Sequence, residues 1–490
     1  MIEEQKSYKQ IFKATTIFGS VQVINLFLGI IKSKLIALFI GASGLGIYSI
    51  LTSTVDLIVR FTSLGLESSA VREIAMFEND PEGLNTRSKA LLNLSLLTGL
   101  IGGLFMLFFS AEISQVSFGN NNYSFLFVWG SISILIKQIT NVNLAVLQGL
   151  RKVKDLAKAN MFGAIFGIII SVPLFYFFQQ KAIISVFLIN ALIGFVVSYF
   201  YIKKVHFKKI KLSIIDSIQE SKSAVKLGLV LSFGGLITYF LSYLFQIYLS
   251  RFFGIGNVGM YNAGFTILNS YVGIVFTVMS TDYYPKLVSL VNLPEKLNKA
   301  VSENIFISLL ILTPIVLIFI AFTNQIVEIL FSKEFVVINS MLTWAILGMI
   351  VKSASWSLGY VILAKGDTKF YLKNSFFFNI ILFIFNVVGF YYKGFEGLGM
   401  SFLVYYILHF FVLFFLVKEK FKIQMSTEVI NFFCYSILLS ILTFVTSTIS
   451  ILVIKWTLLL ILIVISVVMS IYQLNKKIDL REYFKNSFKK

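Results

Sequence analysis

Apolar runs of roughly 18 to 25 residues, the length of a transmembrane helix, recur along the chain from Ile17 to Tyr472 and are separated by short polar or glycine-rich segments. At about 1.5 Å per helical residue, each run is long enough to cross about 30 Å of hydrocarbon. No interval between the runs is long enough for a folded soluble domain. We therefore expect an all-α polytopic membrane protein with about fourteen transmembrane helices, over residues 17–40, 47–66, 90–110, 123–147, 157–178, 182–202, 227–253, 258–280, 301–322, 335–363, 370–391, 397–417, 429–448 and 456–472.

Basic residues are concentrated in the two tails and in every second loop, which together hold 32 of the 42 lysines and arginines. The opposite loops hold only Lys181, Lys333, Lys393 and Lys455. In short loops this bias marks the cytoplasmic side, so we expect a multi-pass protein of the cell (inner) membrane with both termini in the cytoplasm. The net charge of +19 therefore indicates contact with anionic membrane lipid rather than nucleic acid.

An internal repeat relates the two halves of the chain. FIGASGLGIY, residues 39–48, matches FFGIGNVGMY, residues 252–261, at an offset of 213, and three lysines from Lys137 match three from Lys352 at an offset of 215. Six predicted spans lie between the copies, so both enter the membrane in the same direction. The repeat predicts an N-lobe at 1–212 with helices 1–6 and a basic cytoplasmic loop, a C-lobe at 213–422 with helices 7–12, and an appended helical hairpin, helices 13 and 14, with a basic cytoplasmic tail at 423–490.

Charged residues inside the spans are the main candidates for function, because each costs about 2.5–3.5 kcal/mol near a helix centre. The basic ones are Lys32, Lys34, Arg60, Lys137, Arg251 and Lys352. Lys34 and Arg251 lie near span ends, where they either face a cavity or reach to the interface. Arg60 either faces the cavity or pairs with Asp56, four residues earlier. Lys137 and Lys352 occupy equivalent repeat positions and are expected to line a central cavity, while Lys32 is left unassigned.

An excess of cations in a cavity favours an anionic cargo, and lysine and arginine suit phosphate or pyrophosphate. We therefore interpret Lys34, Arg60, Lys137, Arg251 and Lys352 as a cationic substrate-binding cavity. Asp56 and Asp282 are candidates for a gate or for ion coupling.

No catalytic motif stands out: the sequence has no Walker loop, nucleophile elbow or zinc-protease motif. One cysteine, Cys434, and two histidines, His206 and His409, leave little for a metal or haem. We expect no enzyme activity, no metal and no cofactor.

Residues 34–75 and 248–290, which contain the two glycine-rich motifs, resemble the corresponding parts of bacterial O-antigen flippases of the Wzx type. These proteins belong to the polysaccharide transporter branch of the multidrug/oligosaccharidyl-lipid/polysaccharide flippase superfamily. The resemblance covers about Lys9 to Glu419 and implies two six-helix bundles forming a V that opens alternately to either side. The appended hairpin, which many O-antigen flippases lack, is a departure that keeps teichoic acid, capsule and exopolysaccharide export open.

The resemblance implies a flippase that moves an undecaprenyl-pyrophosphate-linked oligosaccharide to the outer leaflet for lipopolysaccharide or other polysaccharide biosynthesis. A glycan polymerase and assembly proteins are possible partners. Three alternatives remain: a cation-coupled multidrug exporter of the same fold, a glycan polymerase or glycosyltransferase, and a non-transporting scaffold. A multidrug exporter calls for acidic residues deep in the cavity, and a polymerase calls for a large outer loop, which the sequence lacks.

Overall fold

The computed structural model describes residues 2–205, 207–208 and 210–477 of the 490-residue chain. Over these residues the secondary structure consists of helices, with no strand. The predicted all-α class of a polytopic membrane protein is therefore confirmed. Contacts between helices divide the chain into two compact units, Met1–Asn262 and Ala263–Lys490. The lobe boundaries at 212 and 422 follow the sequence repeat rather than these contacts, and they stay predictions.

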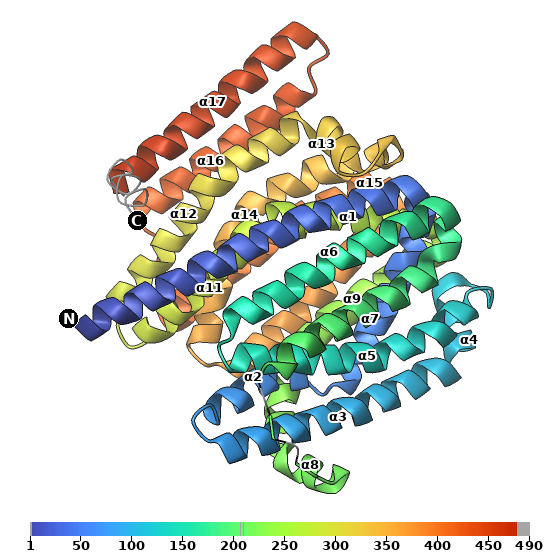
Figure 1. The fold of residues 1–490 in the computed structure, drawn as a ribbon. Helices are drawn as coiled ribbons and strands as arrows, with labels where there is room; N and C mark the ends of the chain where they lie inside the picture. The colour runs from blue at the N-terminus through green and yellow to red at the C-terminus, as the bar shows by residue number, and fades with distance from the viewer. Residues whose placement is uncertain (1, 206, 209, 478–490) are drawn as a thin grey trace. The chain divides into compact units, whose positions relative to one another are not determined.

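The N-terminal unit is built mainly from long helices that pack side by side. α3 lies along α5, and α6 lies along α7 (Figure 1). α9 packs on α1 and α2. The helices are α1 (Ile2–Thr62), α2 (Leu66–Met76), α3 (Pro81–Phe108), α4 (Ser110–Phe118), α5 (Ser124–Gly149), α6 (Val153–Phe178), α7 (Ile183–Lys203), α8 (Ile214–Glu220) and α9 (Lys222–Phe253), with the 3-10 turn η1 (Gln179–Ala182) between α6 and α7.

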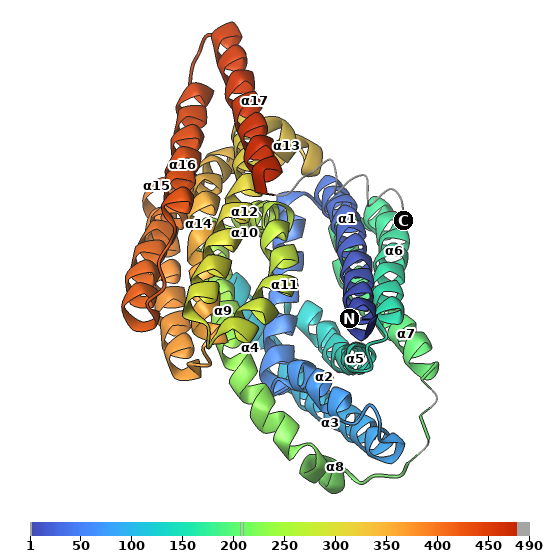
Figure 2. The ribbon, with the colours of Figure 1, turned by 90° about the vertical axis from the view of Figure 1, so that its left-hand side faces the viewer.

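The C-terminal unit has a core of α12, α14 and α15, with α16 packed on α12 and α14. α16 and α17 form a hairpin (Figure 2), and the most apolar stretch of α17 is only 11% buried, as expected of a helix that faces lipid. The elements are α10 (Ile255–Thr266, which starts in the N-terminal unit), the π-helical turn η2 (Ile267–Val272), α11 (Ile274–Leu290), α12 (Pro294–Ala321), α13 (Thr323–Leu330), the 3-10 turn η3 (Lys333–Ile338), α14 (Asn339–Ala364), α15 (Thr368–Phe421), α16 (Thr427–Ser447) and α17 (Leu452–Lys477).

Among the described residues, 10 helical stretches are long and apolar enough to cross a membrane, or 11 if the bent stretch from α10 to α11 is one span. Three of them, Leu26–Thr62, Val153–Lys203 and Thr368–Phe421, are 37, 51 and 54 residues long. Val153–Lys203 and Thr368–Phe421 each hold two predicted spans, and Leu26–Thr62 holds the greater part of two. The helix count therefore does not by itself establish the predicted number of fourteen.

Glycines with positive φ interrupt the helices at the predicted turns. Gly41, with φ 65°, joins the two parts of α1, and Gly394, with φ 54°, joins the two parts of α15. Gly254, which is equivalent to Gly41 in the repeat, has φ 96° and separates α9 from α10. Glycine adopts this backbone conformation without the steric cost that a Cβ imposes, so these positions end one helix and start the next.

Helix boundaries repeat along the chain at the two offsets that the motifs gave. α3 and α12 both begin at a proline, and both their first and their last positions differ by the offset of 213. The first and last positions of α5 and α14 differ by the offset of 215. α6 and the first part of α15 keep this second offset, from the start at Val153 and Thr368 to the break at Gln179 and Gly394. The backbone therefore follows the repeat that the sequence shows.

The two copies of the glycine-rich motif touch each other inside the N-terminal unit. A Cβ on Gly46 would fall against the carbonyl oxygen of Ile255, and a Cβ on Gly259 would fall against that of Ala42. Ala42 and Gly46 are equivalent to Ile255 and Gly259 in the repeat, so the contact is the same from both sides, as at a two-fold axis. Glycine at both positions lets the two backbones approach this closely.

Candidate functional site

A cavity of about 430 Å³, here called the main cavity, lies within the N-terminal unit among α1, α2, α5 and α7. Five of its lining residues are of charged type: the basic Lys32, Arg60 and Lys137 and the acidic Asp56 and Glu67. Their formal charges sum to one positive charge. The cavity is therefore polar and weakly cationic although the helices that enclose it are apolar.

One face of α1 supplies much of this polarity. Tyr48, Thr52, Asp56 and Arg60 line the main cavity at four-residue spacing, which places them one above another on the helix. Ile50, on the other side of the helix, is fully buried. Packing of the apolar face thus fixes the direction of the polar face.

Asp56 and Lys137 form an ion pair across the main cavity wall, from α1 to α5. The Lys137 Nζ donates to the Asp56 Oδ1 at 2.8 Å, and the two side chains are 38% and 28% exposed for Asp56 and Lys137 respectively. The Lys137 ammonium also lies 5.1 Å from the centre of the Phe187 ring. An ion pair with this exposure adds at most about 1 kcal/mol to stability, so an incoming anion can compete for the lysine.

Arg60 has a different partner from the one that the sequence suggested. Its Nη2 donates to the hydroxyl of Tyr239 at 3.0 Å, and its guanidinium lies 3.8 Å from the centre of that ring. Asp56 pairs with Lys137 instead, so the suggested Asp56–Arg60 pair is wrong. Arg60 keeps its charge uncompensated by any carboxylate among its described contacts.

Several polar residues of the main cavity are not among the predicted site residues. They are Lys32, Glu67, Thr140, Asn141 and Asn190. Asn141 Nδ2 donates to the Glu67 Oε2 at 3.5 Å. Each of these residues is polar and lies within or beside an apolar run, which is the signal that could have drawn attention to them.

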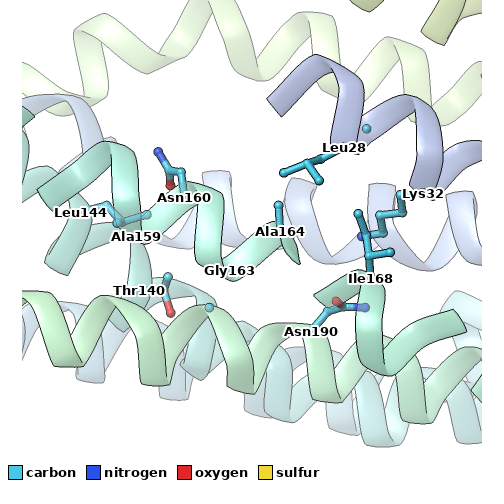
Figure 3. A pocket seen from close by; sticks show the side chains of 12 residues that line it. Leu28, Lys32, Thr140, Leu144, Ala159, Asn160, Gly163, Ala164, Ile168 and Asn190 are labelled. Atoms are coloured by element: carbon cyan, nitrogen blue, oxygen red, sulfur yellow. The ribbon is translucent and has the colours of Figure 1, made fainter. Parts of the chain in front are cut away.

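A side pocket of about 380 Å³ lies next to the main cavity, among α1, α5, α6 and α7 (Figure 3). The two share Lys32, Thr140, Asn190 and Gly194 as lining residues. A Cβ on Gly163 would meet no atom within 4 Å, so the pocket has room beside α6. The shared residues make the two hollows neighbours on either side of Lys32.

Arg251 does not line either hollow, and its guanidinium lies at the end of α4. Its Nη1 donates to the carbonyl oxygens of Gln115 and Val116, in the last turn of that helix. A cation at this place donates hydrogen bonds to the last carbonyl groups of the helix and interacts favourably with the negative end of the helix dipole. Lys34, which is partly buried, is also not among the lining residues of the two hollows.

The remaining predicted site residues belong to the C-terminal unit. The Lys352 Nζ donates to the Oδ1 of Asn269 at 3.2 Å. Asp282 is exposed on α11. The structure thus brings together Asp56, Arg60 and Lys137 of the predicted set, while the roles of all seven predicted residues stay predictions.

Comparison with known proteins gives a family and a fold. A model of the family described as "Polysaccharide biosynthesis protein" matches residues 11–291, which is more than half of the chain. A protein of Escherichia coli (strain K12) named "Lipid III flippase" is 22% identical over 377 residues, covering 74% of this chain and 86% of that protein.

Two solved structures share the fold at low sequence identity. The lipid II flippase MurJ in an inward closed conformation is 14% identical, with a TM-score of 0.70, over 95% of this chain and 99% of that one. An inward-facing multidrug resistance transporter of the MATE family is 14% identical, with a TM-score of 0.63, over 82% of this chain and 94% of that one. The predicted resemblance to the flippase superfamily is confirmed by these matches together with the family model. The chain belongs to the polysaccharide biosynthesis protein family.

Proposed function

We propose that the chain is a flippase that moves an undecaprenyl-pyrophosphate-linked oligosaccharide, such as an O-antigen repeat unit, from the cytoplasmic to the outer leaflet of the inner membrane by alternating access. It acts as a transporter and not as an enzyme. Both termini lie in the cytoplasm, and a glycan polymerase and assembly proteins work beside it. The E. coli relative is named a flippase of lipid III, which supports a lipid cargo.

The observation that carries this proposal is the charge of the main cavity. Lys32, Arg60 and Lys137 outnumber the carboxylates Asp56 and Glu67 in a hollow that apolar helices enclose. Such a site holds an anion better than a cation, because charge interactions weaken less there than in water. A pyrophosphate has the multiple oxygens that lysine and arginine donors bind.

The neutral polar residues suit the sugar part of the cargo. Thr52, Thr140, Asn141 and Asn190 line the main cavity, and hydroxyls and amides can both donate to and accept from sugar hydroxyls. The side pocket adds room next to Lys32. The lipid tail needs no polar surface and stays in the bilayer.

A cation-coupled multidrug exporter is the second candidate, because Asp56 and Glu67 are carboxylates in the same cavity. The fold is also shared with multidrug transporters, although fold alone does not set function. In an exporter of cationic drugs the two carboxylates, rather than the three basic residues, would be required for transport.

The test is a strain that lacks this chain, complemented with wild type, Lys137→Ala, Asp56→Ala or Lys181→Ala, with equal membrane levels confirmed. Lys181 lies in an exposed turn between α6 and α7 and serves as the matched control. We expect lipid-linked repeat units to accumulate on the cytoplasmic face of the deletion strain. Wild type and Lys181→Ala should clear them, and Lys137→Ala should not. Normal glycan display in the deletion strain, with increased drug sensitivity, would instead favour the exporter.

A further inference from the structure

The ion pair of the N-terminal unit has a counterpart in the C-terminal unit. Lys137 and Lys352 are equivalent at the offset of 215, and their partners Asp56 and Asn269 are equivalent at the offset of 213. The Lys137 Nζ lies 2.8 Å from the Asp56 Oδ1, and the Lys352 Nζ lies 3.2 Å from the Asn269 Oδ1. The same lysine contact is therefore made in each half of the repeat.

An aromatic ring completes the arrangement in both units. The Lys137 ammonium lies 5.1 Å from the centre of the Phe187 ring, and the Lys352 ammonium lies 5.7 Å from that of Phe402. Phe187 and Phe402 are themselves equivalent at the offset of 215. Three contacting residues in each unit thus follow the repeat.

The two copies differ in charge. Asp56 neutralises Lys137, whereas Asn269 offers Lys352 only an amide oxygen. No carboxylate is among the contacts of Lys352 within the described part of the chain. A lysine ammonium has three donors, and Asn269 uses one of them. The second copy therefore keeps a net positive charge, whereas the ion pair of the first copy is neutral overall.

The second copy also surrounds its lysine with more rings. Phe276 and Tyr406 lie with ring centres 5.4 and 5.3 Å from the Lys352 Nζ. Their equivalents in the first copy are the small residues Ser63 and Ala191. Aromatic faces attract an ammonium but do not cancel its charge. They hold the charged lysine inside an apolar helix bundle without a carboxylate.

The helix is irregular at Asn269. Asn269 is exposed and lies in the π-helical turn Ile267–Val272, while the equivalent residues 54–59 of the first copy are regular α-helix. The flanking helices bend by 43° after this turn. Such π turns are frequent at functional sites.

We propose that Lys352, Asn269 and the rings of Phe276, Phe402 and Tyr406 form a phosphate-binding site for the cargo in the C-terminal unit, in addition to Lys137 of the main cavity, and that the amide at 269 keeps this site available. The proposal rests on the proposed function, which it makes specific. The ammonium donates charge-assisted hydrogen bonds to phosphoryl oxygens, and the amide nitrogen of Asn269 adds a donor where a carboxylate would repel the anion. An aspartate at position 269 would form an ion pair with Lys352, like that of Asp56 and Lys137 in the N-terminal unit.

The test measures binding of farnesyl diphosphate to the purified full-length protein in detergent. Farnesol is the probe that lacks the phosphates, and inorganic pyrophosphate is a competitor that lacks the isoprenoid. Asn269→Asp is compared with wild type and with Asn122→Asp, which adds the same charge in an exposed turn between α4 and α5. We expect wild type and Asn122→Asp to bind farnesyl diphosphate but not farnesol. Asn269→Asp should lose about tenfold or more in affinity, as expected when a hydrogen bond to a charged group is lost.

Melting temperature and gel filtration show whether Asn269→Asp is folded, and Lys352→Met, which should also lose binding, replaces it if it is not. If folded Asn269→Asp binds as tightly as wild type, the assignment of this site is overturned while the flippase proposal stands. If wild type does not bind farnesyl diphosphate, the pyrophosphate cargo itself is contradicted. If inorganic pyrophosphate displaces farnesyl diphosphate, the phosphates are the part that is recognised. If it does not, and farnesol also binds, the phosphate site is overturned in favour of a groove that binds the isoprenoid.

Discussion

The close contact of Gly46 with the backbone of Ile255 predicts how much a methyl group at position 46 lowers stability. In Gly46→Ala the new methyl group falls against the carbonyl oxygen of Ile255, a backbone atom that cannot rotate away. Overpacking of this kind costs about 1–3 kcal/mol. In Gly163→Ala the new methyl group meets nothing within 4 Å, so that variant gains only the helix propensity of alanine, about 1 kcal/mol.

The two variants make the same substitution inside helices, so the gain in propensity cancels in their comparison. The difference that remains is the cost of the contact, about 1–3 kcal/mol. Thermal unfolding of each purified variant in the same detergent, at one heating rate, measures it as a difference in apparent melting temperature. We expect Gly46→Ala to melt clearly below Gly163→Ala, and Gly163→Ala to melt at or above wild type. Equal melting temperatures for the two would refute the close backbone contact between the copies of the motif.

Two further predictions concern contacts away from the main cavity. Arg251→Met should lower the melting temperature, because it removes the hydrogen bonds to Gln115 and Val116 at the end of α4, a loss of about 1–3 kcal/mol for a charged donor. Glycan export at equal membrane levels should persist. Loss of export without loss of stability would instead indicate that Arg251 belongs to the substrate site. Outside the spans, a hydrogen bond from Lys420, followed by one from the backbone N–H of Phe370, lowers the pKa of Asp367, so the stability gained is complete at neutral pH and is lost as the pH falls through the lowered pKa. Lys420→Met should therefore be less stable than wild type at pH 7, with a gap that narrows in acid, and a gap that widens in acid would contradict this sign.

The fold class could be predicted because it depends on local patterns. Apolar runs of membrane length and basic loops are properties of short segments, and the repeat offsets of 213 and 215 reappear as helix boundaries. The number of spans was harder to establish, because α1 and α15 each consist of two helical parts that meet directly at a non-helical residue, Gly41 or Gly394, with no intervening loop.

The partners of the charged residues could not be predicted, because they are tertiary contacts. Spacing along one helix suggested Arg60 as the partner of Asp56, but the partner is Lys137, 81 residues away on α5. In the same way Arg251 reaches the carbonyls of α4, which no local pattern in its own helix indicates. The repeat identified Lys137 and Lys352 as equivalent residues, and each lysine contacts an equivalent residue in its own unit. Their role in binding the cargo stays a prediction.

The most direct test of whether the protein flips a pyrophosphate-linked lipid through Lys137 and Lys352 is transport of a fluorescent undecaprenyl-pyrophosphate-linked disaccharide in proteoliposomes. Wild type is compared with the Lys137→Met/Lys352→Met double variant and with Lys181→Met, with equal amounts of folded protein reconstituted. We expect wild type and Lys181→Met to expose the probe in the opposite leaflet and the double variant to do so only at the rate of protein-free vesicles. Transport by the double variant at the wild-type rate would contradict the claim that these two lysines bind the pyrophosphate.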